Sequence, residues 1–158
     1  MGAKSKHQVV LVPVDFSAHS VAALECGAEL ADALKLRLLV LHVVHDLGEA
    51  PGYYSVKGMG KQLRRMEDVA ADMLESFLRE AKKSHPKLSA LQKAETELVV
   101  GLPVNRILEV AKKYDACMIV MGSQGRTGLK HVLLGSKAEQ VVHVSPIPVT
   151  IVKANDKG

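Results

Sequence analysis

Short apolar runs alternate along this chain with segments whose apolar residues recur at helical spacing, and this alternation most restricts the fold. Runs rich in Val, Leu and Ile predict five strands, at 8–15, 37–44, 94–101, 116–122 and 147–154. The periodic segments between them predict helices, at 21–35, 61–83, 103–114 and 136–143. Alternating strands and helices form βαβ units with right-handed crossovers. We therefore expect an α/β fold, a three-layer sandwich with helices on both faces of a five-stranded parallel sheet.

Local signals mark where the helices begin and end. Ser17 is a candidate N-cap for the first helix, and Pro103 suits the first turn of the helix after the third strand. His85-Pro86 ends the long helix over 61–83. Residues 45–60 hold four glycines and one proline, which predicts a mobile loop.

Composition excludes several classes of protein. With 158 residues the chain is expected to form one domain over 1–158, with flexible termini at 1–7 and 155–158. A net charge of +4 without a basic stripe, and 3% aromatic residues, argue against nucleic-acid binding. The sequence has neither a leader pattern nor an apolar run near the ~20 residues that span a bilayer, so no membrane association and a cytoplasmic location are expected. Two cysteines are expected to be buried free thiols.

The segment after the fourth strand reads GSQGRTGLKHVLLGS and leads into a helix. Gly122, Gly125 and Gly135, followed by Ser136, give the spacing Gly-x2-Gly-x9-Gly-Ser. Glycines let backbone N–H groups approach a ligand closely, and N–H groups at a helix start favour an anion. The spacing predicts a phosphate site, to which Arg126 and Lys130 are candidate contributors. It is neither a P-loop nor the G-x-G-x-x-G fingerprint.

Asp15 follows the first strand and is the second candidate for the ligand site, after the glycine segment. Ligands of open α/β sheets bind at the carboxyl ends of strands, so Asp15 faces the glycine loop if strands one and four are neighbours. Ordinary structural roles compete with this hypothesis. Asp15 can cap the first helix, the glycines can be turn residues, and Ser136 with Glu139 matches a capping box. The seven histidines show no metal spacing and are interpreted as structural or surface residues.

The chain resembles the universal stress protein family, in its single-domain ATP-binding form, over nearly its whole length. The resemblance rests on VPVDFS at the first strand, LHVV at the second, VVGLPVNRIL at the third, and the stretch from IVMGSQGRTG to PIPVTIVK. In that family the Gly-x2-Gly-x9-Gly-[Ser/Thr] motif marks members that bind ATP, and it is intact here. The family often has Asp-Gly-Ser after its first strand, where this chain has Asp15-Phe16-Ser17.

The resemblance implies strand order 3-2-1-4-5 and assigns roles to particular residues. Asp15 would contact the adenine or ribose side, or help to hold a metal. The residues lining the adenine pocket would be Pro13, Val14, Val43 and Met121. The residues holding ribose and phosphates would be Gly122, Ser123, Gly125, Gly135 and Ser136.

The function implied is an ATP-binding, dimeric stress-response regulator that uses Mg²⁺ or Mn²⁺ and acts on an unidentified protein partner. Strand five would be an exposed apolar edge, so we expect a homodimer by antiparallel pairing of 148–153, as in the family. Alternatives are a slow ATPase, a module that binds AMP or a cyclic adenine nucleotide, and a module that binds no nucleotide. Asp15 and Arg126 are the only obvious catalytic candidates for hydrolysis. A phospho-receiver would need more acids after the first strand.

Overall fold

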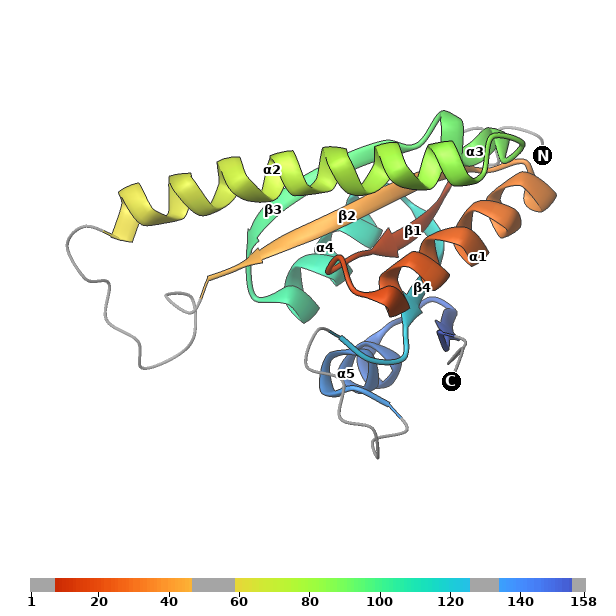
Figure 1. Cartoon of the computed structure of the whole chain (residues 1–158). Helices are drawn as coiled ribbons and strands as arrows, with labels where there is room; N and C mark the ends of the chain where they lie inside the picture. Colours follow the sequence, from red (N-terminus) through yellow and green to blue (C-terminus); the bar gives the residue numbers. More distant parts are fainter. Residues whose placement is uncertain (1–7, 47–58, 126–133, 155–158) are drawn as a thin grey trace.

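The computed structural model describes residues 8–46, 59–125 and 134–154, and it has the expected alternation of strands and helices (Figure 1). Its elements are β1 (Val9–Pro13), α1 (Ala18–Leu34), β2 (Arg37–His45), α2 (Met59–Ser84), α3 (Ser89–Gln92), β3 (Glu95–Gly101), α4 (Pro103–Lys113), β4 (Ala116–Gly122), α5 (Ser136–Val144) and β5 (Val149–Val152). The expectation of flexible termini falls outside the described residues, as does the expected loop over 45–60 for its residues 47–58. The ends of that predicted loop are wrong, because His45 belongs to β2 and residues 59–60 belong to α2.

All five strands form one parallel sheet with the order β3-β2-β1-β4-β5, which confirms the predicted fold class and strand order. β1 lies between β2 and β4, with Leu11 opposite Leu39 on one side and Ile119 on the other. The carboxyl ends of β1 and β4 are therefore adjacent, as the sequence hypothesis for Asp15 requires.

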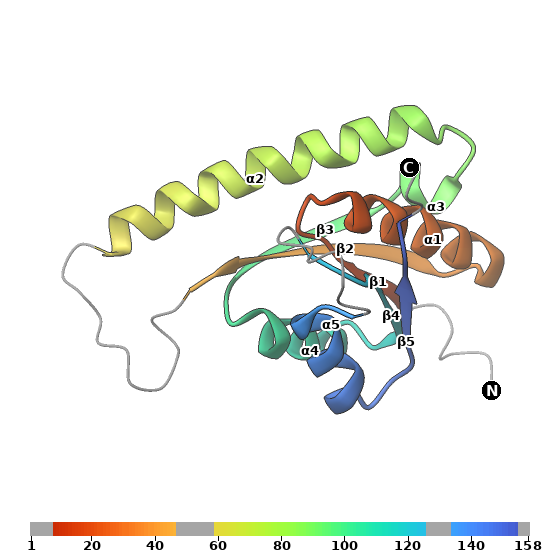
Figure 2. The ribbon, with the colours of Figure 1, turned by 60° about the horizontal axis from the view of Figure 1, so that its bottom comes forward.

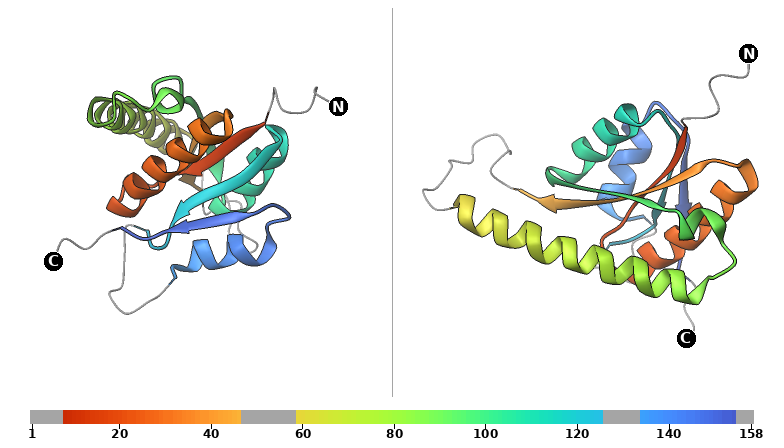
Figure 3. Two further views of the ribbon diagram at one scale, coloured as in Figure 1. Left: turned by 90° about the vertical axis from the view of Figure 1, so that its right-hand side faces the viewer. Right: turned by 90° about the horizontal axis from the view of Figure 1, so that it is seen from above.

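Helices cover both faces of the sheet, α1 and α2 on one side and α4 and α5 on the other (Figure 3). Successive strand residues point to opposite faces, so each strand supplies both layers of core. Val10, Val12 and Val120 belong to the cluster under α1 and α2. Leu11 and Ile119 belong to the cluster under α4 and α5. Apolar strands of this kind are typical of a sheet covered on both sides.

The N-terminus of α1 is fixed by the predicted cap. The Ser20 N–H donates to the Ser17 hydroxyl oxygen at 3.2 Å, and the helix begins at Ala18, earlier than the apolar periodicity indicated. The helix ends in a left-handed residue, Lys35, with φ 57°. The Leu36 N–H then donates to the Ala31 carbonyl, a Schellman-type ending.

The longest helix, α2, projects beyond the sheet at its N-terminal end (Figure 2). Ala70, Leu74 and Leu78 are buried against the sheet. The side chains of Met66 and Val69, nearer the projecting end, remain 49% and 57% exposed. Within the described residues, no helix is both long and apolar enough to span a bilayer.

Candidate functional site

Asp15 lies just beyond β1 and organises the start of α1. Its Oδ1 accepts hydrogen bonds from the Ser17 N–H at 3.0 Å and from the Ser20 hydroxyl at 2.6 Å. Its own N–H donates to Ser20 Oγ at 2.8 Å. The structural role proposed for Asp15 is therefore present, although the N-cap itself is Ser17. These bonds hold the carboxylate in one orientation.

The other oxygen of Asp15 faces the glycine loop. A Cβ added to Gly125 would lie 2.9 Å from Asp15 Oδ2, closer than such atoms approach, so only glycine leaves this space open. Gly122 is confined more rigidly on another side, because a Cβ there would lie 2.7 Å from His19 Cβ and 2.9 Å from its backbone. The first two glycines of the motif thus allow the loop to approach α1 and Asp15 closely.

The third glycine closes the loop on itself. The Gly135 N–H donates to the Ser123 carbonyl at 2.6 Å, which joins the two ends of the motif. Gly135 is also the N-cap of α5, and no side chain caps this helix. The expected capping box of Ser136 and Glu139 is therefore wrong, because Ser136 is already inside the helix. The first N–H groups of α5 begin at exposed Ser136, beside the loop, where they suit an anion.

Three of the four predicted adenine-pocket residues lie on neighbouring strands. Val43 on β2 and Met121 on β4 both pack on the α4 and α5 side of the sheet. Pro13 ends β1 between these two strands, two residues after Leu11 on the same face. Val14 is not brought to this group, since its side chain is buried in the cluster under α1 and α2. Its N–H donates to the Leu41 carbonyl at 2.8 Å.

Phe16, the residue that departs from the family pattern, is in the left-handed region with φ 68°. Its ring stacks on His42 at 4.4 Å and meets Phe77 edge-on at 5.6 Å. His42 Nδ1 lies 2.7 Å from the Val14 carbonyl, which can only accept, so this nitrogen carries the proton. His42 is therefore a structural histidine, as interpreted from the sequence.

Ser123, directly after β4, and His19, in the first turn of α1, lie together at the carboxyl ends of the strands. Ser123 is 3% exposed, so its side chain is directed into the protein. His19 Nδ1 lies 3.5 Å from Ser123 Oγ. Sequence reasoning grouped His19 with the other histidines and gave it no part in the site. Its position two residues after an N-cap carried no signal, because its importance depends on which strands lie beside α1.

The expectations for metal ligands, phosphate-binding cations and cysteines have different outcomes. In the part of the chain that the structure describes, no three His, Cys, Asp or Glu side chains gather at metal-binding distance. Arg126 and Lys130, expected to reach phosphate oxygens, lie outside the described residues. Cys26 and Cys117 are free and half-buried, and partial burial raises the pKa of both thiols. Raised thiol pKa values agree with cysteines that serve as small apolar residues.

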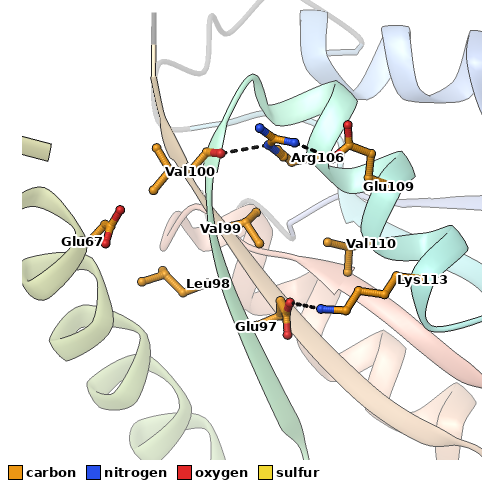
Figure 4. A pocket seen from close by; sticks show the side chains of 9 residues that line it. All are labelled: Glu67, Glu97, Leu98, Val99, Val100, Arg106, Glu109, Val110 and Lys113. Carbon is orange, nitrogen blue, oxygen red and sulfur yellow. Dashed lines mark hydrogen bonds and ion pairs between the residues drawn. The ribbon is translucent and has the colours of Figure 1, made fainter. Parts of the chain in front are cut away.

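Two surface hollows lie along β3, and none of the predicted site residues lines either. One of about 440 Å³ lies between β3 and α4, with Glu67 of α2 beside it (Figure 4). In it, Lys113 pairs with Glu97 at 2.8 Å and Arg106 with Glu109 at 2.6 Å. The second, of about 730 Å³, lies between α2 and β3. Four of the charged groups that line the first hollow are thus paired with one another.

Comparisons with known proteins agree on one family. The model of the universal stress protein family matches residues 6–153. Universal stress protein MJ0531 of Methanocaldococcus jannaschii is 29% identical, over 96% of this chain and 85% of the relative. The structure of universal stress protein UspA from Lactobacillus plantarum is similar with a TM-score of 0.77 and 26% identity, covering 93% of this chain and 98% of that one.

Two of the similar structures contain an adenine nucleotide, cAMP in one and dAMP in the other, and the first is the more similar to this chain in sequence. It is a universal stress protein in complex with cAMP, 26% identical to this chain, with a TM-score of 0.64. The match covers 96% of this chain and 100% of that protein.

Proposed function

Because this chain belongs to the universal stress protein family, we propose that it is a dimeric regulator that binds ATP at the carboxyl ends of β1 and β4. The observation that carries the proposal is the start of α5, which has no side-chain cap and is held against the glycine loop opposite Asp15. An uncapped helix start beside glycine backbone favours phosphate. The cAMP complex of a similar protein supports an adenine nucleotide as the ligand class.

Each part of the nucleotide has a suitable partner here. The N–H groups that follow Gly135, with those around Gly125, would bind phosphate oxygens. Asp15 is an acceptor and would repel phosphate, so it is better placed for ribose hydroxyls, which can donate to it. The apolar group of Pro13, Val43 and Met121 would pack against adenine.

Asp15 also limits how a metal ion would bind. Mg²⁺ is commonly held by one or two carboxylates together with substrate phosphates. One carboxylate beside the phosphate site fits that pattern, so Asp15 would hold Mg²⁺ or Mn²⁺ only together with the nucleotide. The ion would neutralise phosphate charge and reduce the repulsion from Asp15.

The dimer would form through β5, the edge of the sheet. All four residues of β5 are half-buried, Val149 to Val152, and its outer edge has no neighbouring strand in the described chain. The adjacent helix α5 leaves Val142 and Val144 43% and 56% exposed. An apolar strand edge of this kind favours pairing with another chain, here a second copy. The regulated protein partner would respond to the nucleotide state of this dimer.

Calorimetric titration with ATP, AMP and cAMP tests the proposal and ranks the ligands. Asp15→Asn keeps the acceptor for Ser17 but removes the charge, and we expect it to weaken ATP binding roughly 10-fold, the value of one charged hydrogen bond. Gly125→Val places a side chain against Asp15 and should abolish measurable binding. Asp68→Asn, on the exposed side of α2, is the charge-matched control. Equal ATP affinity in wild type, Asp15→Asn and Gly125→Val would contradict the proposal. Preference for cAMP would favour the cyclic ligand instead.

A further inference from the structure

Ser123 uses all of its polar groups to join three elements. Its N–H donates to the Val152 carbonyl on β5 at 2.9 Å. Its carbonyl accepts from the N–H of Gly135, the N-cap of α5, at 2.6 Å. Its Oγ lies 3.5 Å from His19 Nδ1 on α1. A residue that is 3% exposed and bonded in three directions fixes the position of the glycine loop relative to β5.

His19 makes a second connection between the same elements. Its Nδ1 accepts the N–H of Ala154, just beyond β5, at 3.3 Å. An amide N–H can only donate, so Nδ1 is the unprotonated acceptor in this arrangement. The backbone of His19 is also packed against Gly122, where no Cβ fits. One side chain thus contacts the start of the glycine loop and the end of the edge strand.

We infer that His19 is a positioning residue that couples the nucleotide site to the β5 edge, so that phosphate binding and self-association strengthen each other. The inference rests on the proposed function, since it needs both the ligand and the dimer. Phosphate bound at Gly125 and Gly135 favours one position of Ser123. Through Ser123 and His19, that position orders Val152, the last residue of the strand that pairs with the second copy, and Ala154 just beyond it.

Thermodynamic linkage makes the coupling measurable from either side. If dimerisation tightens ATP binding at each of the two sites by some coupling factor, saturating ATP must tighten the dimer by the square of that factor. We expect a factor of about 5 or more, at the lower end of common allosteric couplings. Substituting a residue that has only a structural role would change the stability of the fold without changing this coupling factor.

The test measures the dimer dissociation constant by sedimentation equilibrium, without nucleotide and with saturating ATP, and ATP affinity by calorimetry. His19→Phe removes the acceptor and keeps a ring, and His19→Asn restores an acceptor at a similar position. His85→Phe is the matched control, because His85 contacts Glu25 and the Ala81 carbonyl, away from the loop. We expect His19→Phe to bind ATP and dimerise with a coupling factor near 1. His19→Asn and His85→Phe should retain the wild-type factor.

Two outcomes would overturn the coupling. One is a wild-type protein that binds ATP and dimerises with neither affecting the other. The second is a His19→Phe variant with the wild-type coupling factor. A wild-type protein that fails to bind ATP, or stays monomeric, would instead refute the proposed function, and the coupling with it. Since binding and association are measured separately, these failures are distinguishable.

Discussion

At the scale of single residues, Phe16 combines a glycine-like backbone with the side chain of a core residue. Its φ of 68° lies in the left-handed region, which costs a non-glycine residue roughly 1–2 kcal/mol. The ring recovers part of that energy by stacking on His42 and by its edge-on contact with Phe77. The chain contains two phenylalanines, and both are in this contact. Residue 16 is therefore both a left-handed turn position and a packing position in this chain.

Substitutions at Phe16 separate the backbone from the ring. Phe16→Ala keeps the left-handed strain and loses the stacking, so we expect a loss of about 2–3 kcal/mol in the free energy of unfolding. Phe16→Gly loses the same ring but relieves the backbone, and should be about 1 kcal/mol more stable than Phe16→Ala. Urea denaturation at neutral pH measures both differences. A glycine variant no more stable than the alanine variant would show that residue 16 is not left-handed in solution.

At the scale of elements, α4 is joined to the edge strand β3 by a cluster of three side chains. The Glu97 carboxylate accepts from Lys113 at 2.8 Å and from the Tyr114 hydroxyl at 2.5 Å. These hydrogen bonds, with that from Lys113 the larger cause, lower the pKa of Glu97 below its ordinary 4.5. The hydrogen bond to Glu97 also raises the pKa of Tyr114.

The lowered pKa of Glu97 predicts how this cluster depends on pH. A carboxyl group whose pKa is lower in the folded state stabilises the fold above its unfolded pKa, and that contribution disappears as pH falls through the folded value. Glu97→Gln should therefore cost up to about 1 kcal/mol at pH 7, a modest value because the pair is partly solvated. Denaturation at several pH values should show the difference from wild type shrinking below pH 4.5. Tyr114→Phe should show the same trend with a smaller amplitude, and a difference that persists at low pH would contradict this account.

The elements themselves were largely predictable from the sequence, for identifiable reasons. β4 has the predicted bounds because its apolar run ends in Gly122. β1 is shorter than predicted, because the backbone leaves the sheet after Pro13 to form the turn around Asp15. α3 was missed, because four residues are too few for helical periodicity to appear. Its position is set by a tertiary contact, the Ala90 N–H donating to Asp32 of α1 at 2.7 Å.

The site was less predictable, because its geometry depends on strand order. Asp15 and the motif glycines could be named from their positions after strands. Asp15 lies close to Gly125 only because β1 lies beside β4 in the sheet. The periodicity of apolar residues does not specify that strand order. The uncapped start of α5 contradicted the capping-box pattern, since Gly135 took the cap position. The roles of Ser123 and His19 depend on residues far away in the sequence, so no local sequence pattern predicted these roles.

At the scale of the whole molecule, the two edges of the sheet differ. β3 lies between α2 and α4 and carries charged residues, whereas β5 is a short apolar edge. The Pro148 and Val152 carbonyls accept from Ile119 and Ser123, so these residues face β4. Because backbone groups alternate along a parallel strand, the N–H groups of Val149 and Ile151 point away from the sheet. This outer edge is the one available to a second copy.

Removing one outward N–H should therefore separate the dimer without breaking the sheet. Ile151→Pro eliminates the outer donor and leaves the bonds to β4, so we expect a monomer in sedimentation velocity at micromolar concentration. Ile151→Ala loses the same packing but keeps the N–H, and should remain dimeric. Monomeric wild-type protein, or an unchanged dimer in Ile151→Pro, would contradict pairing through β5.

The strand order also has a consequence for synthesis on the ribosome. The half of the sheet built from β1, β2 and β3 leaves the exit tunnel first, and β4 and β5 follow later. Until then β1 lacks its second neighbour, and Asp15 has no glycine loop opposite it. Ser123 and Ala154, which meet at His19, are among the later residues to emerge. A nascent chain therefore acquires its candidate ligand site only after β4 and the start of α5 have followed β1 out of the ribosome, so nucleotide capture would require most of the sheet to be synthesised.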